Sequence, residues 1–145
     1  MAVILSAEHL AEIRQQAETA YPHEGCGLMG GANDGDARRV TRLVPVLNAR
    51  SDSPRNRYLI EPDDFLRAQR ALDRDGLEVV GVYHSHPDHP ARPSAFDEEQ
   101  AWPRLSYIIV SVARGAAADA RSWVLADDRG GFTEEPITIE ERVAT

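Results

Sequence analysis

Two histidines separated by a single residue, His84 and His86, carry the strongest chemical signal in the sequence. The residues before them predict a strand, on which positions i and i+2 project from the same face with Cα atoms about 6.6 Å apart. That spacing lets two imidazoles bind one ion. Asp97 follows one loop later and offers a carboxylate. Two histidines and one carboxylate, with a fourth position left to water, are typical of a catalytic Zn²⁺ site.

The cysteine count argues against a structural zinc site. Such sites normally use four protein ligands, often thiolates, and Cys26 is the single cysteine of the chain. We expect Cys26 to be a small buried hydrophobic side chain, with a reactive thiol as the alternative. One cysteine cannot form an internal disulfide, which fits a reducing, cytoplasmic location.

Ser94 and Asp97 also have an ordinary structural explanation. Ser-x-x-Asp at the start of a helix resembles a capping box, in which each side chain accepts a hydrogen bond from the other residue's backbone. The backbone of Ser94 can begin the helix while its hydroxyl faces the metal. For Asp97 the two roles compete, because a carboxylate bound to zinc has less freedom to cap. Beside two histidines, we favour the ligand role for Asp97.

Several residues near these motifs have simpler interpretations. His23 and His89 are expected to face solvent or to lie around the site rather than to bind the metal, and His89 belongs to a loop stiffened by Pro87, Pro90 and Pro93. Phe96 and Trp102 are expected to pack the helix that follows this loop onto the sheet. None of them adds a ligand to the predicted set.

Helical and strand patterns alternate along the chain. Ser6 is the expected N-cap of a first helix that ends before Pro22, and Pro62 and Gly76 frame a second one. This alternation predicts an α/β sandwich with a mixed β-sheet, in which the ligands lie at the end of a central strand. The expected strands are 26–31, ended by a glycine pair, 38–47, 77–86, 105–112, 121–125 and a last one through 137–139, with a third helix at about 94–102.

Length and composition set further limits. The 145 residues are most simply one domain, 1–145, and the net charge of −8 disfavours a protein that coats nucleic acid. All 16 basic residues are arginines. The N-terminal residues lack the basic and apolar regions of a signal peptide, so we expect no signal peptide. No apolar stretch is long enough to span a membrane, so we expect no membrane span.

The motif His84-x-His86-Pro87, followed after six residues by Ser94-x-x-Asp97, resembles the signature of the JAMM/MPN+ (Mov34/PAD-1) metallopeptidases. The segment from Glu24 to Leu28 looks like the upstream glutamate motif of that family. The resemblance extends from about residue 10 to residue 124. It is strongest to the small stand-alone bacterial branch that acts on ubiquitin-like sulfur-carrier proteins.

This resemblance implies a function and a role for each residue. His84, His86 and Asp97 would bind Zn²⁺, Glu24 would hold the attacking water, and Ser94 would stabilise the tetrahedral intermediate. The implied fold is a three-layer αβα sandwich related to cytidine deaminases. The implied reaction is hydrolysis of the bond after the C-terminal Gly-Gly of a sulfur carrier, which releases an amino acid such as cysteine. Arginines 50, 55 and 57 would meet an acidic carrier surface or form a solvated loop.

The sequence leaves four alternative functions to consider. Removal of a carrier from protein lysines is a second enzymatic possibility. A catalytically silent MPN scaffold that binds partners usually lacks part of the motif, and all five residues are present here. Relatives of the RadC type tend to carry an additional helix-hairpin-helix region, for which 145 residues leave no space. A nucleoside deaminase would need His-x-Glu and Pro-Cys-x-x-Cys elements, which the sequence lacks.

Overall fold

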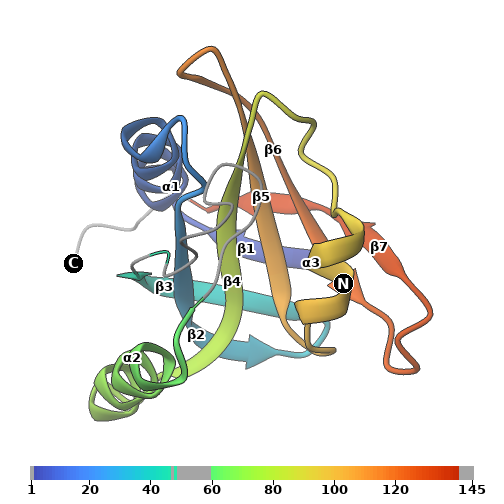
Figure 1. Cartoon of the computed structure of the whole chain (residues 1–145). Helices are drawn as coiled ribbons and strands as arrows, with labels where there is room; N and C mark the ends of the chain where they lie inside the picture. The colour runs from blue at the N-terminus through green and yellow to red at the C-terminus, as the bar shows by residue number, and fades with distance from the viewer. Residues whose placement is uncertain (1, 47, 49–59, 141–145) are drawn as a thin grey trace.

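A mixed sheet of eight strands with three helices around it forms the part of the chain that the computed structural model describes, residues 2–46, 48 and 60–140 (Figure 1). The helices are α1 (Ala7–Ala20), α2 (Pro62–Arg74) and α3 (Ala95–Gln100). The strands are β1 (Ala2–Leu5), β2 (Cys26–Asp34), β3 (Ala37–Val46), β4 (Glu78–Pro87), β5 (Ser106–Ala113), β6 (Ala116–Leu125), β7 (Phe132–Glu135) and β8 (Ile137–Ile139). Within the described residues, no helix combines the length and the apolar character that a membrane crossing requires.

The strand order is β7-β6-β5-β4-β2-β3-β1-β8. Parallel pairs, such as β4 with β5, are combined with antiparallel pairs, such as β4 with β2. This arrangement confirms the predicted α/β class with a mixed sheet. Strand β4, which carries both histidines, is a central strand with a hydrogen-bonded neighbour on each side.

The sheet curls until its two end strands almost meet. Strands β7 and β8 stand at opposite ends of the strand order, yet only Pro136 separates them in the chain. The same curl brings Arg38 of β3 beside Glu135 of β7, with Nη1 of the guanidinium 3.9 Å from Oε1 of the carboxylate. The sheet is therefore close to a barrel. The more specific prediction, a three-layer sandwich of the cytidine-deaminase type, stays a prediction.

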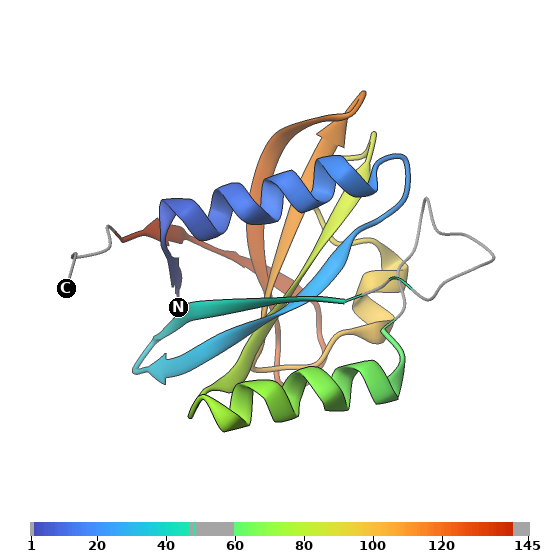
Figure 2. The same ribbon diagram turned by 90° about the vertical axis from the view of Figure 1, so that its left-hand side faces the viewer.

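Helices α1 and α2 cover opposite sides of this curled sheet (Figure 2). Ser6 caps α1 as predicted, because its hydroxyl accepts the backbone N–H three residues further on at 3.0 Å. The buried side of α1 presents Ile13 and Ala17 to one apolar cluster, and that of α2 presents Ala68 and Leu72 to the interior. The two helices thereby enclose the strands that hold the site.

Three strand predictions need correction. The glycine pair Gly30–Gly31 does not end β2, because the strand continues to Asp34 and only shifts its pairing register at the glycines. Strand β1 was not predicted, since four residues become a strand only through their pairing with distant β3 and β8. The expected last strand is two strands, because Pro136 has no N–H to continue the ladder.

Gly81 permits the close contact between β4 and its neighbours. It pairs with Ser106 of β5, and a Cβ at this position would lie 2.3 Å from the Ser106 carbonyl oxygen and 2.5 Å from Cε of Met29. A side chain there would push β4 away from β5. The absence of a side chain at Gly81 therefore helps to set the depth at which the two histidines lie.

We expect Gly81→Ala to lower the free energy of unfolding by about 1–3 kcal/mol, because the added methyl group overpacks a rigid backbone contact. Urea denaturation followed by circular dichroism measures the change. Gly130→Ala is the control: its Cβ would meet only the Asp128 carboxyl group, so a change within about 0.5 kcal/mol is expected. A Gly81→Ala protein as stable as the wild type would contradict the close approach.

Candidate metal centre

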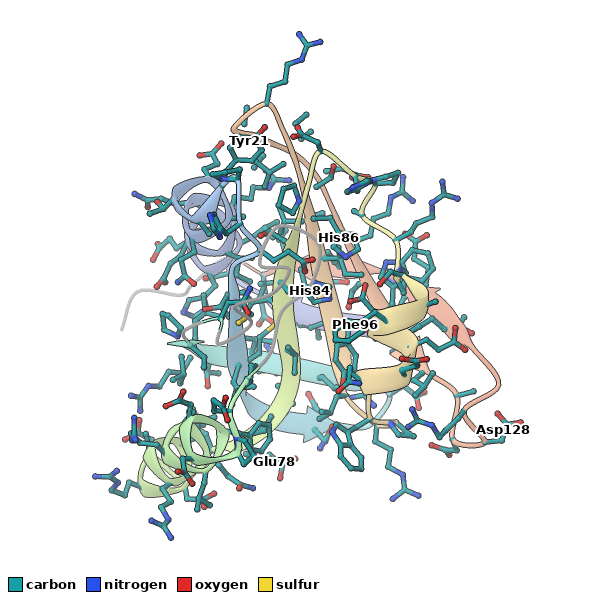
Figure 3. All side chains as sticks on the ribbon, in the orientation of Figure 1. Tyr21, Glu78, His84, His86, Phe96 and Asp128 are labelled. Atoms are coloured by element: carbon teal, nitrogen blue, oxygen red, sulfur yellow. The ribbon has the colours of Figure 1, made fainter. Side chains whose placement is uncertain are left out.

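Strand β4 holds both histidines in the interior. His84 pairs with Cys26 of β2 and with Ile109 of β5, so its backbone is held from both sides. His84 is 2% exposed and His86 is 7% exposed. Their ring centroids are 5.1 Å apart, and both rings lie between β4 and α3 (Figure 3). The spacing expected from the sequence is therefore present, with both rings shielded from solvent.

The loop after β4 fixes the orientation of the His86 ring. The carbonyl oxygen of Pro90 lies 2.9 Å from His86 Nδ1. Because a carbonyl oxygen only accepts hydrogen bonds, Nδ1 must carry the proton, and Nε2 is the nitrogen that faces the centre. Metal-binding histidines commonly have a partner of this kind on the other ring nitrogen. The ring is thus prepared to offer Nε2 to an ion.

Asp97 fulfils both roles that the sequence set in competition. Ser94 and Asp97 form the capping box: the Ser94 hydroxyl accepts from the Asp97 N–H at 3.1 Å, and Asp97 Oδ2 accepts from the Ser94 N–H at 2.8 Å. The same carboxylate lies 3.0 Å from His86 Nε2 and 3.8 Å from His84 Nε2. Capping therefore aims the carboxylate at the two rings instead of withdrawing it.

Burial and charge act in opposite directions on this group of residues. Burial alone would raise the pKa of Asp97, but the charge of His84, together with hydrogen bonds from His86 and Ser94, holds this pKa well below its usual range. Burial likewise favours neutral His86, yet the hydrogen bond and charge of Asp97 raise the pKa of its ring. Ring and carboxylate each favour the charged form of the other.

Glu24 approaches the histidines from the opposite side. Its Oε1 lies 3.4 Å from His84 Nδ1, and the residue is 3% exposed. Two contacts fix the backbone here: the Asn48 side chain donates to the Glu24 carbonyl at 3.0 Å, and the Gly25 N–H donates to the Ser85 hydroxyl at 2.8 Å. Among the described residues, Oε1 has no hydrogen-bond donor. A buried carboxylate oxygen without a donor is costly unless it meets a proton or a cation.

Ser85 is a positioning residue that the sequence reasoning missed. It stands between the two histidines, so its side chain points to the other face of β4. There it accepts the Gly25 N–H, while its own N–H donates to the Gly25 carbonyl at 3.0 Å. These two bonds tie the backbone next to Glu24 to the histidine strand. The available signal was a hydroxyl residue inside an otherwise apolar strand, which must find a partner when it is buried.

The structure brings the five predicted site residues to one place. Donor atoms of Glu24, His84 and His86 all lie within 4.8 Å of one another, which makes them a possible metal site, and Asp97 contacts both rings. A cleft of about 480 Å³ opens beside this group. The residues that line it are Glu24, His86, Pro87, His89, Pro90, Arg92 and Ser94.

The remaining sequence predictions near the site have mixed outcomes. His23 is exposed, and His89 lies at the exposed wall of the cleft, so neither joins the buried group. The prediction that Trp102 packs α3 onto the sheet is wrong, because Trp102 is 67% exposed. It precedes Pro103, and a residue before proline avoids the helical conformation, so α3 has already ended at Gln100. Arginines 50, 55 and 57 lie outside the described residues.

Comparison with known sequences identifies related proteins. The family described as prokaryotic homologs of the JAB domain matches residues 6–126. A desampylase from Haloferax volcanii is 40% identical over 70% of this chain and 72% of its own length. A probable TtuB-protein conjugate cleaving protease from Thermus thermophilus is 40% identical over 69% of this chain and 64% of its own. A CysO-cysteine peptidase from Mycobacterium tuberculosis is 32% identical over 97% and 92% of the two chains.

Solved structures share the fold. A protein from Desulfitobacterium hafniense superimposes with a TM-score of 0.84 at 36% identity, covering 97% of this chain and 94% of that one. A JAB1/MPN domain protein from Archaeoglobus fulgidus gives a TM-score of 0.54 at 20% identity, covering 94% and 96% of the two chains. The second likeness concerns the fold alone.

Cys26 is buried beside this centre, which confirms the expectation from the sequence. It is 5% exposed, and its thiol lies 3.5 Å from the Val46 carbonyl oxygen. Burial, and secondly the nearby charge of Glu24, raise the pKa of the Cys26 thiol to about 12. The reactive thiolate is therefore almost absent at neutral pH.

We expect iodoacetamide to label Cys26 in the native protein at least about 100-fold more slowly than in urea at pH 8. Because the thiolate fraction grows about tenfold per pH unit below the pKa, labelling should still accelerate between pH 8 and pH 10. Mass spectrometry measures the rate, and the protein in urea is the control. A rate that levels off near pH 9 would contradict the raised pKa.

Proposed function

This chain belongs to the prokaryotic JAB-domain family, and we propose that it is a zinc-dependent peptidase that cuts after the C-terminal Gly-Gly of a ubiquitin-like sulfur-carrier protein. We further propose that residues 1–145 form a single catalytic domain, that it works in the cytoplasm, and that it releases an amino acid such as cysteine. The names of its relatives, a CysO-cysteine peptidase among them, support this function. The main observation behind this proposal is that two histidines and two carboxylates lie together, buried, beside the cleft.

The donor atoms suit Zn²⁺ held by His84, His86 and Asp97. Zinc lies about 2.0–2.2 Å from nitrogen and oxygen ligands, so two ligands of a tetrahedral site are about 3.3 Å apart. The separations of Asp97 oxygens from the two Nε2 atoms, 3.0 and 3.8 Å, lie on either side of this value. With a proton held on Nδ1 by the Pro90 carbonyl, His86 would bind the ion through Nε2, which loses its own proton to solvent as the ion replaces the contact with Asp97. Nitrogen and oxygen ligands without thiolates are typical of catalytic zinc.

When bound, Zn²⁺ supplies a Lewis acid and lowers the pKa of the attacking water to about 7. Glu24 is the general base in this proposal, because its Oε1 faces the histidines without a donor of its own. It accepts one proton as the water oxygen bonds to the carbonyl carbon, and it delivers that proton to the leaving nitrogen as the C–N bond breaks. The products are a carrier with a free Gly-Gly carboxylate and an amine.

Ser94 stabilises the oxyanion in this proposal. Its hydroxyl oxygen accepts the Asp97 N–H at 3.1 Å, which uses a lone pair and leaves the hydroxyl proton available. The residue is exposed at the wall of the cleft, where the substrate carbonyl would lie. Ser94 can therefore cap α3 and donate to the substrate at the same time. A donor of this type typically contributes about 10²–10³-fold to turnover.

Removal of a carrier from proteins is a second candidate activity. The Thermus thermophilus relative is named as a probable protease that cleaves TtuB-protein conjugates, and its matching region is 40% identical. In such a substrate the leaving nitrogen belongs to a lysine side chain instead of a free amino acid. The same catalytic residues serve both reactions, so the two activities differ in how the cleft binds the leaving group.

We expect Glu24→Gln to retain zinc and to lose at least about 10³-fold in kcat, because glutamine cannot accept the proton. Hydrolysis of a carrier with one amino acid after Gly-Gly, followed by mass spectrometry, measures the loss. Asp36→Asn, at an exposed acidic residue between β2 and β3, is the matched control and should remain fully active. A Glu24→Gln enzyme as fast as the wild type would remove Glu24 from the mechanism.

We expect His86→Ala to lose its zinc, since a two-ligand remnant holds the ion poorly. Elemental analysis of the purified protein gives the metal content directly, and wild-type protein should contain about one zinc per chain. The exposed His23→Ala variant should keep the same content as the wild type. Stoichiometric zinc in His86→Ala would overturn the ligand set.

A further inference from the structure

We propose that Arg92 binds the α-carboxylate of the departing amino acid and so makes the cleft selective for carrier adducts that end in one free amino acid. This inference rests on the proposed function. It assigns a binding residue to the leaving amino acid, which the catalytic residues do not recognise. The cleft wall that carries Arg92 is the loop between β4 and α3, drawn in yellow in Figure 1.

Among the described residues that line the cleft, Arg92 is the one arginine. Several other surface arginines are paired with carboxylates, for example Arg42 with Asp75 and Arg121 with Glu134. Arg92 forms no ion pair and no hydrogen bond with another described residue, although the chain holds 24 acidic residues against 16 basic ones. Its guanidinium therefore remains available to a ligand in the cleft.

The backbone around Arg92 is held firmly on both sides. Before it, the Trp123 indole donates to the Ala91 carbonyl at 3.0 Å, and Pro90 accepts from the His86 ring. After it, Pro93 has a fixed φ, and the Ser94 N–H donates to Asp97. The position of the Arg92 backbone is thus tied to the same residues that form the candidate metal centre. Only the side chain is left to adjust.

Arg92 stands two residues before Ser94, which places their Cα atoms about 6–7 Å apart in an extended chain. In an adduct with a free amino acid, the carboxylate carbon lies only about 2.5 Å from the scissile nitrogen, two bonds away. A carbonyl that receives the Ser94 hydroxyl therefore brings this carboxylate near the guanidinium. The planar guanidinium matches a carboxylate through two parallel hydrogen bonds.

Electrostatics favour a cation at this position. The protein carries a net charge of −8, which disfavours the approach of an anionic leaving group from solvent. Arg92 offsets this repulsion where the carboxylate would lie. A lysine conjugate has no carboxylate beside its scissile nitrogen, and it gains nothing from Arg92. The residue therefore distinguishes the two candidate activities.

The test compares two substrates that differ by one charge. A sulfur carrier is prepared with a single alanine after its Gly-Gly, either as the free acid or as the α-carboxamide. The zinc-loaded wild type should cleave the acid with kcat/KM at least about 10-fold above that of the amide, because only the acid forms the charge-assisted pair. In Arg92→Gln the ratio should fall to about one through a higher KM for the acid, with the amide unaffected.

Two further variants sharpen the result. Arg92→Lys should restore part of the preference, since it keeps the charge but not the two-point contact. Arg14→Ala, on the exposed side of α1, removes the same charge elsewhere and should keep the wild-type ratio. A wild type without preference, or an Arg92→Gln that slows both substrates equally, would overturn the role of Arg92 alone. A zinc-loaded wild type that cleaves neither substrate would overturn the proposed function itself.

Discussion

The buried contact between His84, His86 and the carboxylates of Asp97 and Glu24 is the constraint around which the rest of the structure is organised. Four ionisable side chains in an apolar interior are unstable unless their charges and hydrogen bonds compensate one another. The protein meets this demand by supplying them from three separate segments: the end of β4, the short segment just before β2, and the first turn of α3. The Ser85 hydroxyl ties the segment before β2 to β4, and the His86 ring ties β4 to the Pro90 carbonyl and to Asp97 of α3.

This fastening explains why a short loop and a helix of six residues can form part of the centre. An isolated helix of that length is unstable in water, so α3 depends on its cap and on its contacts. The Ser94–Asp97 capping box stabilises the first turn and orients the carboxylate in one step. The carbonyls of Pro90 and Ala91 hold the preceding loop against His86 and Trp123. The hydrogen bonds that stabilise this loop and α3 are therefore the same ones that set the geometry of the centre.

The sequence revealed those parts of the centre that are close in the chain. The His84-x-His86 spacing and the Ser94-x-x-Asp97 pattern follow from strand and helix periodicity, and both lie where these patterns place them. Spacing alone left Glu24 unplaced; only its family resemblance associated it with the histidines, since sixty residues separate it from His84. The role of Ser85 was missed because it depends on which backbone lies behind β4. Strand β1 and the exposure of Trp102 were missed for the same reason: tertiary contacts decided them.

The position of β8 has a consequence for the nascent chain during its synthesis on the ribosome. Residues 137–139 cover the outer edge of β1, and β7 just before them covers that of β6, so both flanks of the sheet are completed by the last stretch of described chain. Until this stretch leaves the exit tunnel, the nascent polypeptide displays two uncovered strand edges, which favour association with other chains. The net charge of −8 would then make neighbouring nascent chains on one polysome repel one another, which opposes this association.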